Sequence, residues 1–375
     1  MQLRRTTTLA LLGCVTVAAS VLAASAPASA HGSWPPVKPG TPSVIAGGLS
    51  SPLSLAVDEK GNSYLSQNFA GLVSKVSKNG KVTTLASAPG LETSAVSYRN
   101  GTVYYSQLAF DHSSAVLMAL PKGGTPKQIG DIQAYEAKAN PDGKTTYGFT
   151  DLPQACLDQI PADALAPGKY TGIVDTHPYA SLAVRSGVYV ADAGANAILK
   201  VGYNGKVTTT AVLPPAAPVT VTADLAGQAG FPSCVVGYKY RFESVPTDVE
   251  LGPDGYLYVT SLPGGPEDPS LGARGVVYRV SPWSGKSRVV ATGFVGTTGL
   301  AVSPKGTIYV AELFGGGGSG QVSVVKHGVA KKFLTLAGPA AIEISGKKLY
   351  VTTGAAAEEP TASLTVVPLK SRWHH

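Results

Sequence analysis

Short apolar runs separated by glycine-containing turns recur along most of the chain. Residues 52–86 and 299–336 show the unit clearly: an apolar strand, a Gly turn, a strand centred on a tyrosine, a loop, a third strand, a second Gly turn and a fourth strand. Within the runs, Val, Leu and Tyr alternate with small or polar residues, the period-2 pattern of a β-strand. Further copies begin near Glu92, His177, Pro246 and Pro339. The chain is therefore predicted to be all-β and built from repeats.

The turn residues explain why neighbouring strands would pair as hairpins. A polar residue followed by Gly, as in Asn100-Gly101 and Asn204-Gly205, supplies the positive φ that tight antiparallel hairpins need. Only two short stretches, 131–140 and 154–165, favour a helix. Four antiparallel strands per unit, repeated at about forty residues, predict a β-propeller.

The number of blades can be counted on the tyrosine of the second strand. These tyrosines are Tyr64, Tyr104, Tyr189, Tyr258, Tyr309 and Tyr350. They predict six blades. Seven blades are the alternative, because Pro141-Asp142-Gly143 followed by Tyr147 imitates a first hairpin. Residues 152–168 contain no strand-like run that would complete such a blade, so an extended loop is preferred.

The ends of the chain predict how the ring closes. The last copy, 339–368, has three strands, and the segment Pro42–Gly47 resembles a fourth strand without its own first three. We expect this N-terminal strand to complete the last blade, because an unpaired sheet edge would otherwise stay exposed.

The first thirty residues are predicted to be a signal peptide. Arg4 and Arg5 form a positive region, residues 9–22 are mostly apolar, and residues 28–30 form a small-residue cleavage motif. A lipobox ending at Cys14 is an alternative, but apolar residues continue well beyond it. We therefore expect a secreted, extracytoplasmic protein without a membrane span, in which residues 31–375 form one propeller domain.

Charge is predicted to be divided between the two faces of the propeller. Loss of Arg4 and Arg5 leaves 28 of the 30 Lys and Arg against 23 Asp and Glu, a formal +5. Hairpin turns, which carry most bases and few acids (Glu343 among them), define a turn face. The remaining loops, which carry most acids, define a loop face. The same charge distribution is expected without any functional role, if lysines protect strand edges from pairing with other chains and acidic residues keep the loops solvated.

These faces set the expected partners. The basic turn face would suit an anionic cell-envelope polymer, and the acidic loop face an unknown small molecule or a protein. Nucleic acid is not expected, because no basic stripe with interleaved aromatic residues is present.

Two cysteines remain after signal removal, and they lie in two long connections. Cys156 falls in the insertion 131–176 and Cys234 in the insertion 214–245. In an exported protein a lone cysteine pair favours a disulfide. Two free thiols are the alternative. Because the two insertions flank one blade on the loop face, a disulfide would tie them together.

The candidate site lies on the loop face, where long loops meet the ends of the strands. His177 is the best catalytic candidate because histidine titrates near neutral pH, and Asp192 is the second. The predicted ligand-binding set is Glu92, Asp175, His177, Asp192, Asn196, Asp248 and Glu312. Inward carboxylates of this kind could hold Ca²⁺, although no metal site is identified. Equally, a histidine can cap a strand, Asp192 and Asn196 can build an Asx turn, and polar residues can satisfy the backbone and water.

Five segments together resemble the ScyD/ScyE family of exported bacterial propellers, relatives of NHL-repeat propellers. They are residues 131–143 (DIQAYEAKANPDG), 175–184 (DTHPYASLAV), 189–201 (YVADAGANAILKV), 245–260 (VPTDVELGPDGYLYVT) and 298–313 (TGLAVSPKGTIYVAEL). The resemblance covers nearly the whole expected mature chain and implies a propeller fold. It implies no catalytic residues, and the insertion 144–174 departs from the family pattern.

Two functions remain open from the sequence. The first is a binding or scaffold propeller that presents its loop face to a ligand or partner. The second is a metal-assisted lyase or lactonase-type hydrolase with its site at the channel mouth, similar in architecture to streptogramin lyases and gluconolactonases. Of the two, the binder is the preferred interpretation; the absence of known catalytic motifs excludes neither, because propeller sites assemble from distant blades.

Overall fold

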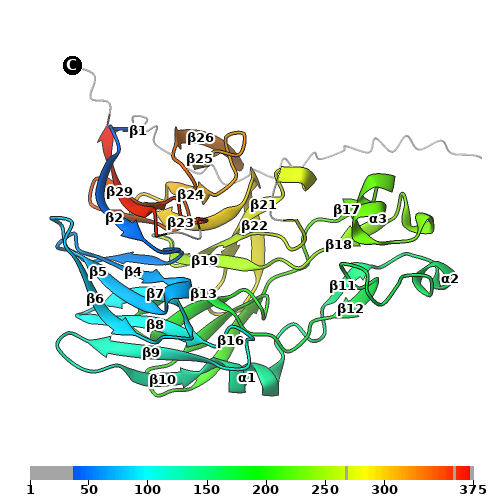
Figure 1. The fold of residues 1–375 in the computed structure, drawn as a ribbon, viewed down its shortest axis with the longest axis horizontal. Helices are drawn as coiled ribbons and strands as arrows, with labels where there is room; N and C mark the ends of the chain where they lie inside the picture. The colour runs from blue at the N-terminus through cyan, green and yellow to red at the C-terminus, as the bar shows by residue number, and fades with distance from the viewer. Residues whose placement is uncertain (1–36, 267–268, 358–359, 372–375) are drawn as a thin grey trace, which may run out of the picture.

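The computed structural model describes residues 37–266, 269–357 and 360–371. The predicted signal peptide lies outside these residues. Most of the described chain forms antiparallel sheets arranged around an axis that runs horizontally in Figure 1. No helix in the described ranges is long and apolar enough to cross a membrane.

Each repeat folds as a sheet whose strands pair in chain order. The first three sheets of the ring contain β3 (Leu55–Val57), β4 (Ser63–Gln67), β5 (Leu72–Val76) and β6 (Val82–Ser87); β7 (Glu92–Arg99), β8 (Thr102–Leu108), β9 (Ala115–Pro121) and β10 (Lys127–Asp131); and β13 (Pro178–Val184), β14 (Gly187–Asp192), β15 (Ala197–Val201) and β16 (Val207–Val212). The next two contain β19 (Pro246–Leu251), β20 (Leu257–Ser261), β21 (Gly275–Val280) and β22 (Ser287–Phe294); and β23 (Thr297–Val302), β24 (Ile308–Glu312), β25 (Gln321–Lys326) and β26 (Val329–Thr335). A single parallel bridge between Thr292 and Val329 joins these two sheets at their outer strands.

The first strands of the sheets form the inner wall of the ring. They contact one another in the order β3, β7, β13, β19, β23 and β27 (Ile342–Ser345), and β27 returns to β3. Apolar side chains fill the space between neighbouring sheets. Leu117 of the second sheet and Leu199 of the third, for example, lie fully buried in one cluster. Each of the six counted tyrosines lies on the second strand of a different sheet, as predicted.

The last sheet is completed from the N-terminus, as predicted. It contains β27, β28 (Lys348–Thr353), β29 (Ala362–Ser371), β2 (Ser43–Leu49) and β1 (Val37–Pro39). Strand β2 pairs antiparallel with β29 from Ser43 opposite Val366 to Leu49 opposite Ala362. Leu49 is buried beside Leu55 and Leu364. The N-terminal segment therefore holds the first and last sheets together.

The two insertions fold together instead of forming separate loops. Their strands β11 (Thr146–Phe149), β12 (Lys169–Thr171), β17 (Val219–Thr220) and β18 (Lys239–Arg241) make one sheet in the order β12-β11-β18-β17. With α2 (Gln154–Leu157), α3 (Ala223–Ala229) and the 3₁₀ turn η2 (Ser233–Val235), this sheet forms what we call the insertion unit, residues 146–171 and 219–242. It projects from the loop-face end of the ring, at the right of Figure 1.

A disulfide and a separate apolar core hold the insertion unit together. Cys156 is bonded to Cys234, which joins the two insertions as predicted. Phe149, Val235 and Tyr240 are buried around this bond. Disulfides persist in oxidising compartments, so this one is compatible with an extracytoplasmic location. Tyr147, the residue that suggested a seventh blade, lies in this unit, and β11 pairs with β12 and β18.

Three further helical elements, outside both the ring sheets and the insertion unit, lie near loop-face connections. The helix α1 (Ile132–Ala139) follows β10, and the Asp131 carboxylate caps it by accepting the Ala134 N–H at 2.9 Å. The 3₁₀ turn η1 (Asn68–Ala70) follows β4, and η3 (Pro269–Leu271) lies between β20 and β21. Helix α1 falls where the sequence predicted it, whereas α3 was not predicted.

Candidate functional site

Two histidines and two carboxylates meet on the loop face of the second and third sheets. His112, in the loop after β8, lies with its Nδ1 2.7 Å from Asp175 Oδ1. His177, just before β13, lies with its Nε2 3.3 Å from Glu92 Oε1. The two imidazole rings stack with centroids 4.8 Å apart. About a third of the His112 side chain and 27% of the His177 side chain are exposed, so both rings can be reached from solvent.

The second His–carboxylate pair stabilises its own charged form. Burial works to raise the pKa of Glu92, but hydrogen bonds from His177 and from Asn68 Nδ2 (2.9 Å) outweigh it and hold that pKa below the usual range. Burial works to lower the pKa of His177, but Glu92 outweighs it, so the net shift is upward. The pair therefore favours an imidazolium next to a carboxylate, an arrangement that can donate a proton or bind an anion.

Asp192 holds the segment that carries His177. It is fully buried, and its Oδ1 accepts the His177 backbone N–H at 2.8 Å while its Oδ2 accepts the Thr176 hydroxyl at 2.8 Å. Both oxygens are engaged in this way, so the Asp192 carboxylate positions the segment and does not face a ligand. A catalytic role for Asp192 stays a prediction.

Asn196 joins the third sheet to both insertions. Its Nδ2 donates to Asp142 Oδ2 at 2.9 Å, and its Oδ1 accepts the Val245 backbone N–H at 3.0 Å. Its backbone is left-handed, with φ 49°. Asn196 thus lies close to the predicted site but acts as a structural bridge there.

Asp248 and Glu312 are not brought to the histidine pair. Asp248 lines the central channel, where its Oδ2 accepts the Leu300 N–H at 2.8 Å. Glu312 is buried at the end of β24 and accepts the Val295 N–H at 2.7 Å and the Gln321 Nε2 at 2.9 Å. The predicted ligand-binding residues therefore do not form one site. Asp248 lies in the central channel, Glu312 lies at the end of β24, and the others lie at or near the histidine pair.

The central channel contains a carboxylate cluster that the sequence did not predict. Asp248, Glu250 and Glu343 line it together. Glu343 was expected on the turn face, and this is corrected: β27 is an inner strand, which directs the side chain into the channel. Burial raises the pKa of Asp248 to about 7, and burial together with the charge of Asp248 raises the pKa of Glu343 to about 8.

The predicted Ca²⁺ ligands do not form a metal site at the channel mouth. Within the described ranges, no group of three or more His, Cys, Asp or Glu side chains is arranged to hold a metal ion. The oxygens of Asp192, Asp248 and Glu312 already accept hydrogen bonds from the protein. Ca²⁺ binding by these expected residues therefore stays a prediction.

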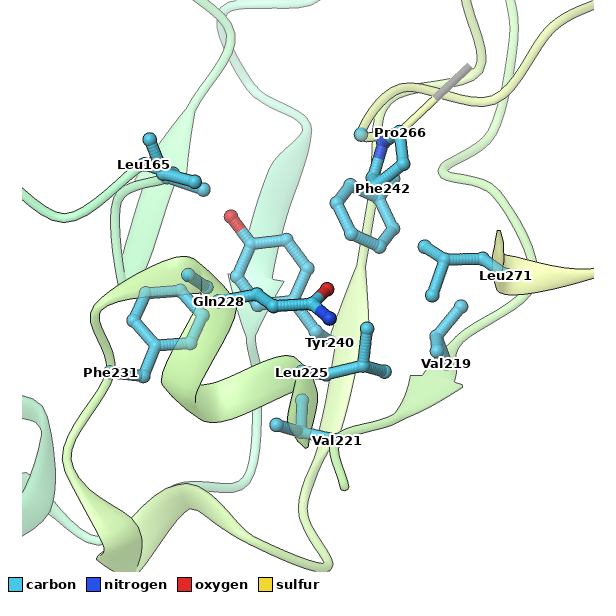
Figure 2. A pocket seen from close by; sticks show the side chains of 13 residues that line it. Leu165, Val219, Val221, Leu225, Gln228, Phe231, Tyr240, Phe242, Pro266 and Leu271 are labelled. Carbon is cyan, nitrogen blue, oxygen red and sulfur yellow. The ribbon is translucent and has the colours of Figure 1, made fainter. Parts of the chain in front are cut away.

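A second concave site lies between the insertion unit and the loop after β20. Its volume is about 480 Å³. Figure 2 shows Phe231, Tyr240 and Phe242 among the side chains around it, with Leu225 and the Gln228 amide directed across it. Apart from Gln228 and the Tyr240 hydroxyl, its labelled side chains are hydrocarbon or aromatic rings.

Polar contacts around the pocket hold its walls in place. The Tyr240 hydroxyl donates to the Pro167 carbonyl at 2.9 Å. Arg274 Nη2 donates to the Gly264 carbonyl at 3.1 Å, and its guanidinium lies 5.0 Å from the centre of the Phe242 ring. The pocket is thus fixed from both sides, by the insertion unit and by the loop after β20.

Sequence reasoning missed His112, Asn68 and the whole apolar pocket. His112 carries no motif, and its link to Asp175 spans 63 residues. Its one available signal was its place in a loop between the second and third strands of a repeat, where loop-face residues gather. The pocket draws on both insertions and on the 262–274 loop, which share no repeat pattern.

Comparison with known proteins supports the fold. No known family profile matches the chain, and no curated protein sequence matches it. Among solved structures, a Bacteroides thetaiotaomicron protein of unknown function is 12% identical with a TM-score of 0.56, covering 89% of this chain and 77% of that one. A PQQ-bound aldose sugar dehydrogenase from Streptomyces coelicolor is 14% identical with a TM-score of 0.51, covering 90% and 100%. A gluconolactonase from Xanthomonas campestris is 12% identical with a TM-score of 0.52, covering 88% and 89%.

At these identities the comparisons show the β-propeller fold alone. Propellers of this shape include lactonase-type and dehydrogenase-type proteins. The resemblance to the ScyD/ScyE family is not confirmed by them.

Proposed function

We propose that the protein is a six-bladed propeller of the ScyD/ScyE type that binds a small, mostly apolar aromatic molecule on its loop face. The blade number is supported by the six first strands that contact one another in a closed cycle. The binding function rests on one observation, the pocket of about 480 Å³ between the insertion unit and the 262–274 loop.

The chemistry of the pocket supports this ligand class. Small-molecule sites are concave, about 300–1,000 Å³ in volume, and lined mainly by apolar and aromatic side chains with a few polar groups that orient the ligand. Phe231 and Phe242 offer ring faces, and Leu225 offers an aliphatic surface. The Gln228 amide offers an NH₂ group that donates and a carbonyl oxygen that accepts. A ligand with one or two aromatic rings and a single polar group would match this surface.

A neutral fluorescent probe tests the proposal directly. N-phenyl-1-naphthylamine has two ring systems and one N–H, and its emission rises in apolar surroundings. We expect saturable binding at one site, weakened at least about tenfold by Leu225→Asp, because a carboxylate would lose its hydration beside the bound rings. Gln228→Trp, from an exposed helix position, should also block the site by filling it.

The matched control is Leu251→Asp, the same change at an exposed leucine at the end of β19 away from the pocket. It should leave the affinity unchanged. Binding that does not saturate, or that is equal in wild type and both pocket variants, would refute the proposed site.

A second function is favoured by the stacked His112 and His177, each next to a carboxylate and open to solvent. It is an acid–base enzyme of the lyase or lactonase-type class, in which the His177 imidazolium donates a proton. A panel of lactone and ester substrates tests it: turnover lost in both His177→Ala and His112→Ala would support it. Turnover that survives both changes would exclude it.

A further inference from the structure

Three residues after β10 carry buried oxygens that accept no hydrogen bond. They are both carboxylate oxygens of Glu136, which the Asp175 backbone N–H approaches without normal hydrogen-bond geometry, the side-chain oxygen of Asn140 and Oδ1 of Asp142. Glu136 is 0% exposed and Asp142 is 1% exposed. Buried acceptors are almost always paired, because an unpaired one has lost its water without replacement. Four unpaired oxygens within seven residues therefore need a partner that is not among the described side chains.

The fold fixes these residues next to one another. Helix α1 ends where the Asn140 N–H bonds to the Glu136 carbonyl at 2.8 Å, and the left-handed backbone of Asn140 (φ 34°) turns the chain back. Asn140 Nδ2 donates to the Gly172 carbonyl at 3.1 Å. The carboxylate of Asp142 lies against Gly172, where any Cβ would collide with it. The glycine thus leaves a notch that this carboxylate occupies.

The neighbours of Asp142 donate to one of its oxygens, and the other lies against Gly172 without a hydrogen bond. Its Oδ2 accepts the Tyr147 hydroxyl and Asn196 Nδ2, both at 2.9 Å. Its Oδ1 therefore stays without a donor on the same carboxylate. This arrangement orients Oδ1 without neutralising the charge.

Among the described residues, neither buried carboxylate forms an ion pair with a basic side chain. The ion pairs found in the described part of the chain are His112–Asp175, His177–Glu92 and Arg279–Asp254, and none includes Glu136 or Asp142. Burial, and after it the charges of Asp192 and Asp142, raise the pKa of Glu136 to about 8. The cluster is therefore a buried region with acceptor oxygens that have no hydrogen-bond partner, and its carboxylates are hard to ionise unless a cation is bound.

We propose that Glu136, Asn140 and Asp142 bind one hard divalent cation, Ca²⁺ from the chemistry of the donors. Ca²⁺ takes carboxylate and amide oxygens, accepts bidentate carboxylates and fills the rest of its sphere with backbone carbonyls or water. Only two acidic side chains take part, which is why the site does not stand out as a group of three acidic, histidine or cysteine ligands. The bound ion would tie the end of α1 to the base of the insertion unit and, through Asn196, to the third sheet.

Calcium titration of the full chain tests the site. After treatment with EGTA, the melting temperature and the bound metal are measured with added Ca²⁺ and, in parallel, with Mg²⁺. We expect one Ca²⁺ per chain by equilibrium dialysis and a saturable rise of several degrees in melting temperature. Ligands bound to the folded state alone stabilise it in this manner.

Variants distinguish binding of Ca²⁺ at these oxygens from simple protonation of the carboxylates. Asp142→Asn and Glu136→Gln should abolish Ca²⁺ binding, and Glu136→Asp, which keeps the charge on a shorter side chain, should weaken it about tenfold. Glu343→Gln, a matched change in the channel carboxylates, should bind Ca²⁺ as the wild type does. If wild type binds no Ca²⁺, or if Glu343→Gln abolishes binding and Glu136→Asp does not weaken it, the proposed site is wrong.

Discussion

The ring and the insertion unit obtain their stability in different ways. In the ring, each sheet packs between two neighbours, and large side chains such as Leu117 and Phe294 are fully buried between sheets. In the insertion unit, strands of two to four residues form one small sheet. A disulfide and an aromatic cluster around Tyr240 hold that sheet together. The ring relies on repetition, and the unit on contacts that occur once.

This difference matters for function because the unit carries the apolar pocket. A scaffold that packs on both sides of every sheet has little freedom to change shape. A small, cross-linked extension can vary without disturbing the ring. Binding sites are often found on long loops that a rigid scaffold holds in position, as the insertion unit is held here by the ring.

The largest effect is expected from opening the ring. Deletion of residues 41–49 removes β2, with the buried Leu49 and Ala46, and exposes the edge of β29. Loss of several buried side chains costs about 5 kcal/mol or more, and we expect the melting temperature to fall by about 10 °C or more. Differential scanning calorimetry measures it. Deletion of residues 37–39, of which Val37 and Lys38 are exposed, is the control and should shift the transition much less.

Removing the disulfide should act on the insertion unit and spare the ring. The double variant Cys156→Ser/Cys234→Ser frees a loop whose ends are separated by 78 residues, worth about 4 kcal/mol on the chain-entropy account. Limited proteolysis should then cut the unit first, within residues 158–168, while the main calorimetric transition moves little. If both regions lose stability together, the unit and the ring are one cooperative structure and the comparison fails.

The repeating half of the molecule could be predicted from sequence because its signals are local. Alternating strands, Gly turns and the second-strand tyrosines each lie within about forty residues, and the closing strand is visible as a copy without partners. The unit's sheet could not be predicted, since Phe149 opposite Tyr240 is a pairing set by tertiary contacts. The channel carboxylates could not be predicted for the same reason, because Glu343 and Asp248 meet in the channel from strands that lie far apart in sequence.

A change in pH should weaken the ring through its channel. Glu343 has its pKa raised from 4.5 to about 8, so the folded state holds a proton that the unfolded state releases between these values. Stability from this group is therefore present at about pH 4 and is lost as the pH rises towards 8. Since each pKa unit corresponds to about 1.4 kcal/mol, Glu343→Gln should be more stable than wild type by about 4 kcal/mol at pH 8.5 and nearly equal at pH 4. Urea unfolding at both pH values measures this.

Glu59→Gln, a change at an exposed acid in a hairpin turn, is the control for the channel experiment. It should show the wild-type dependence on pH. A Glu343→Gln protein whose advantage is the same at both pH values would mean that the channel carboxylate does not titrate as stated.

The smallest effect should be confined to the insertion unit. Tyr240→Phe removes the hydroxyl that donates to the Pro167 carbonyl at 2.9 Å, and it keeps the ring that packs against Phe149 and lines the pocket. Loss of one such hydrogen bond costs about 1 kcal/mol. Because that bond lies within the unit, hydrogen exchange should quicken in β11 and β18 and stay unchanged in β14 and β15 of the adjoining sheet. Faster exchange in both places would show that the unit transmits its stability to the ring, which the separate cores of the two regions argue against.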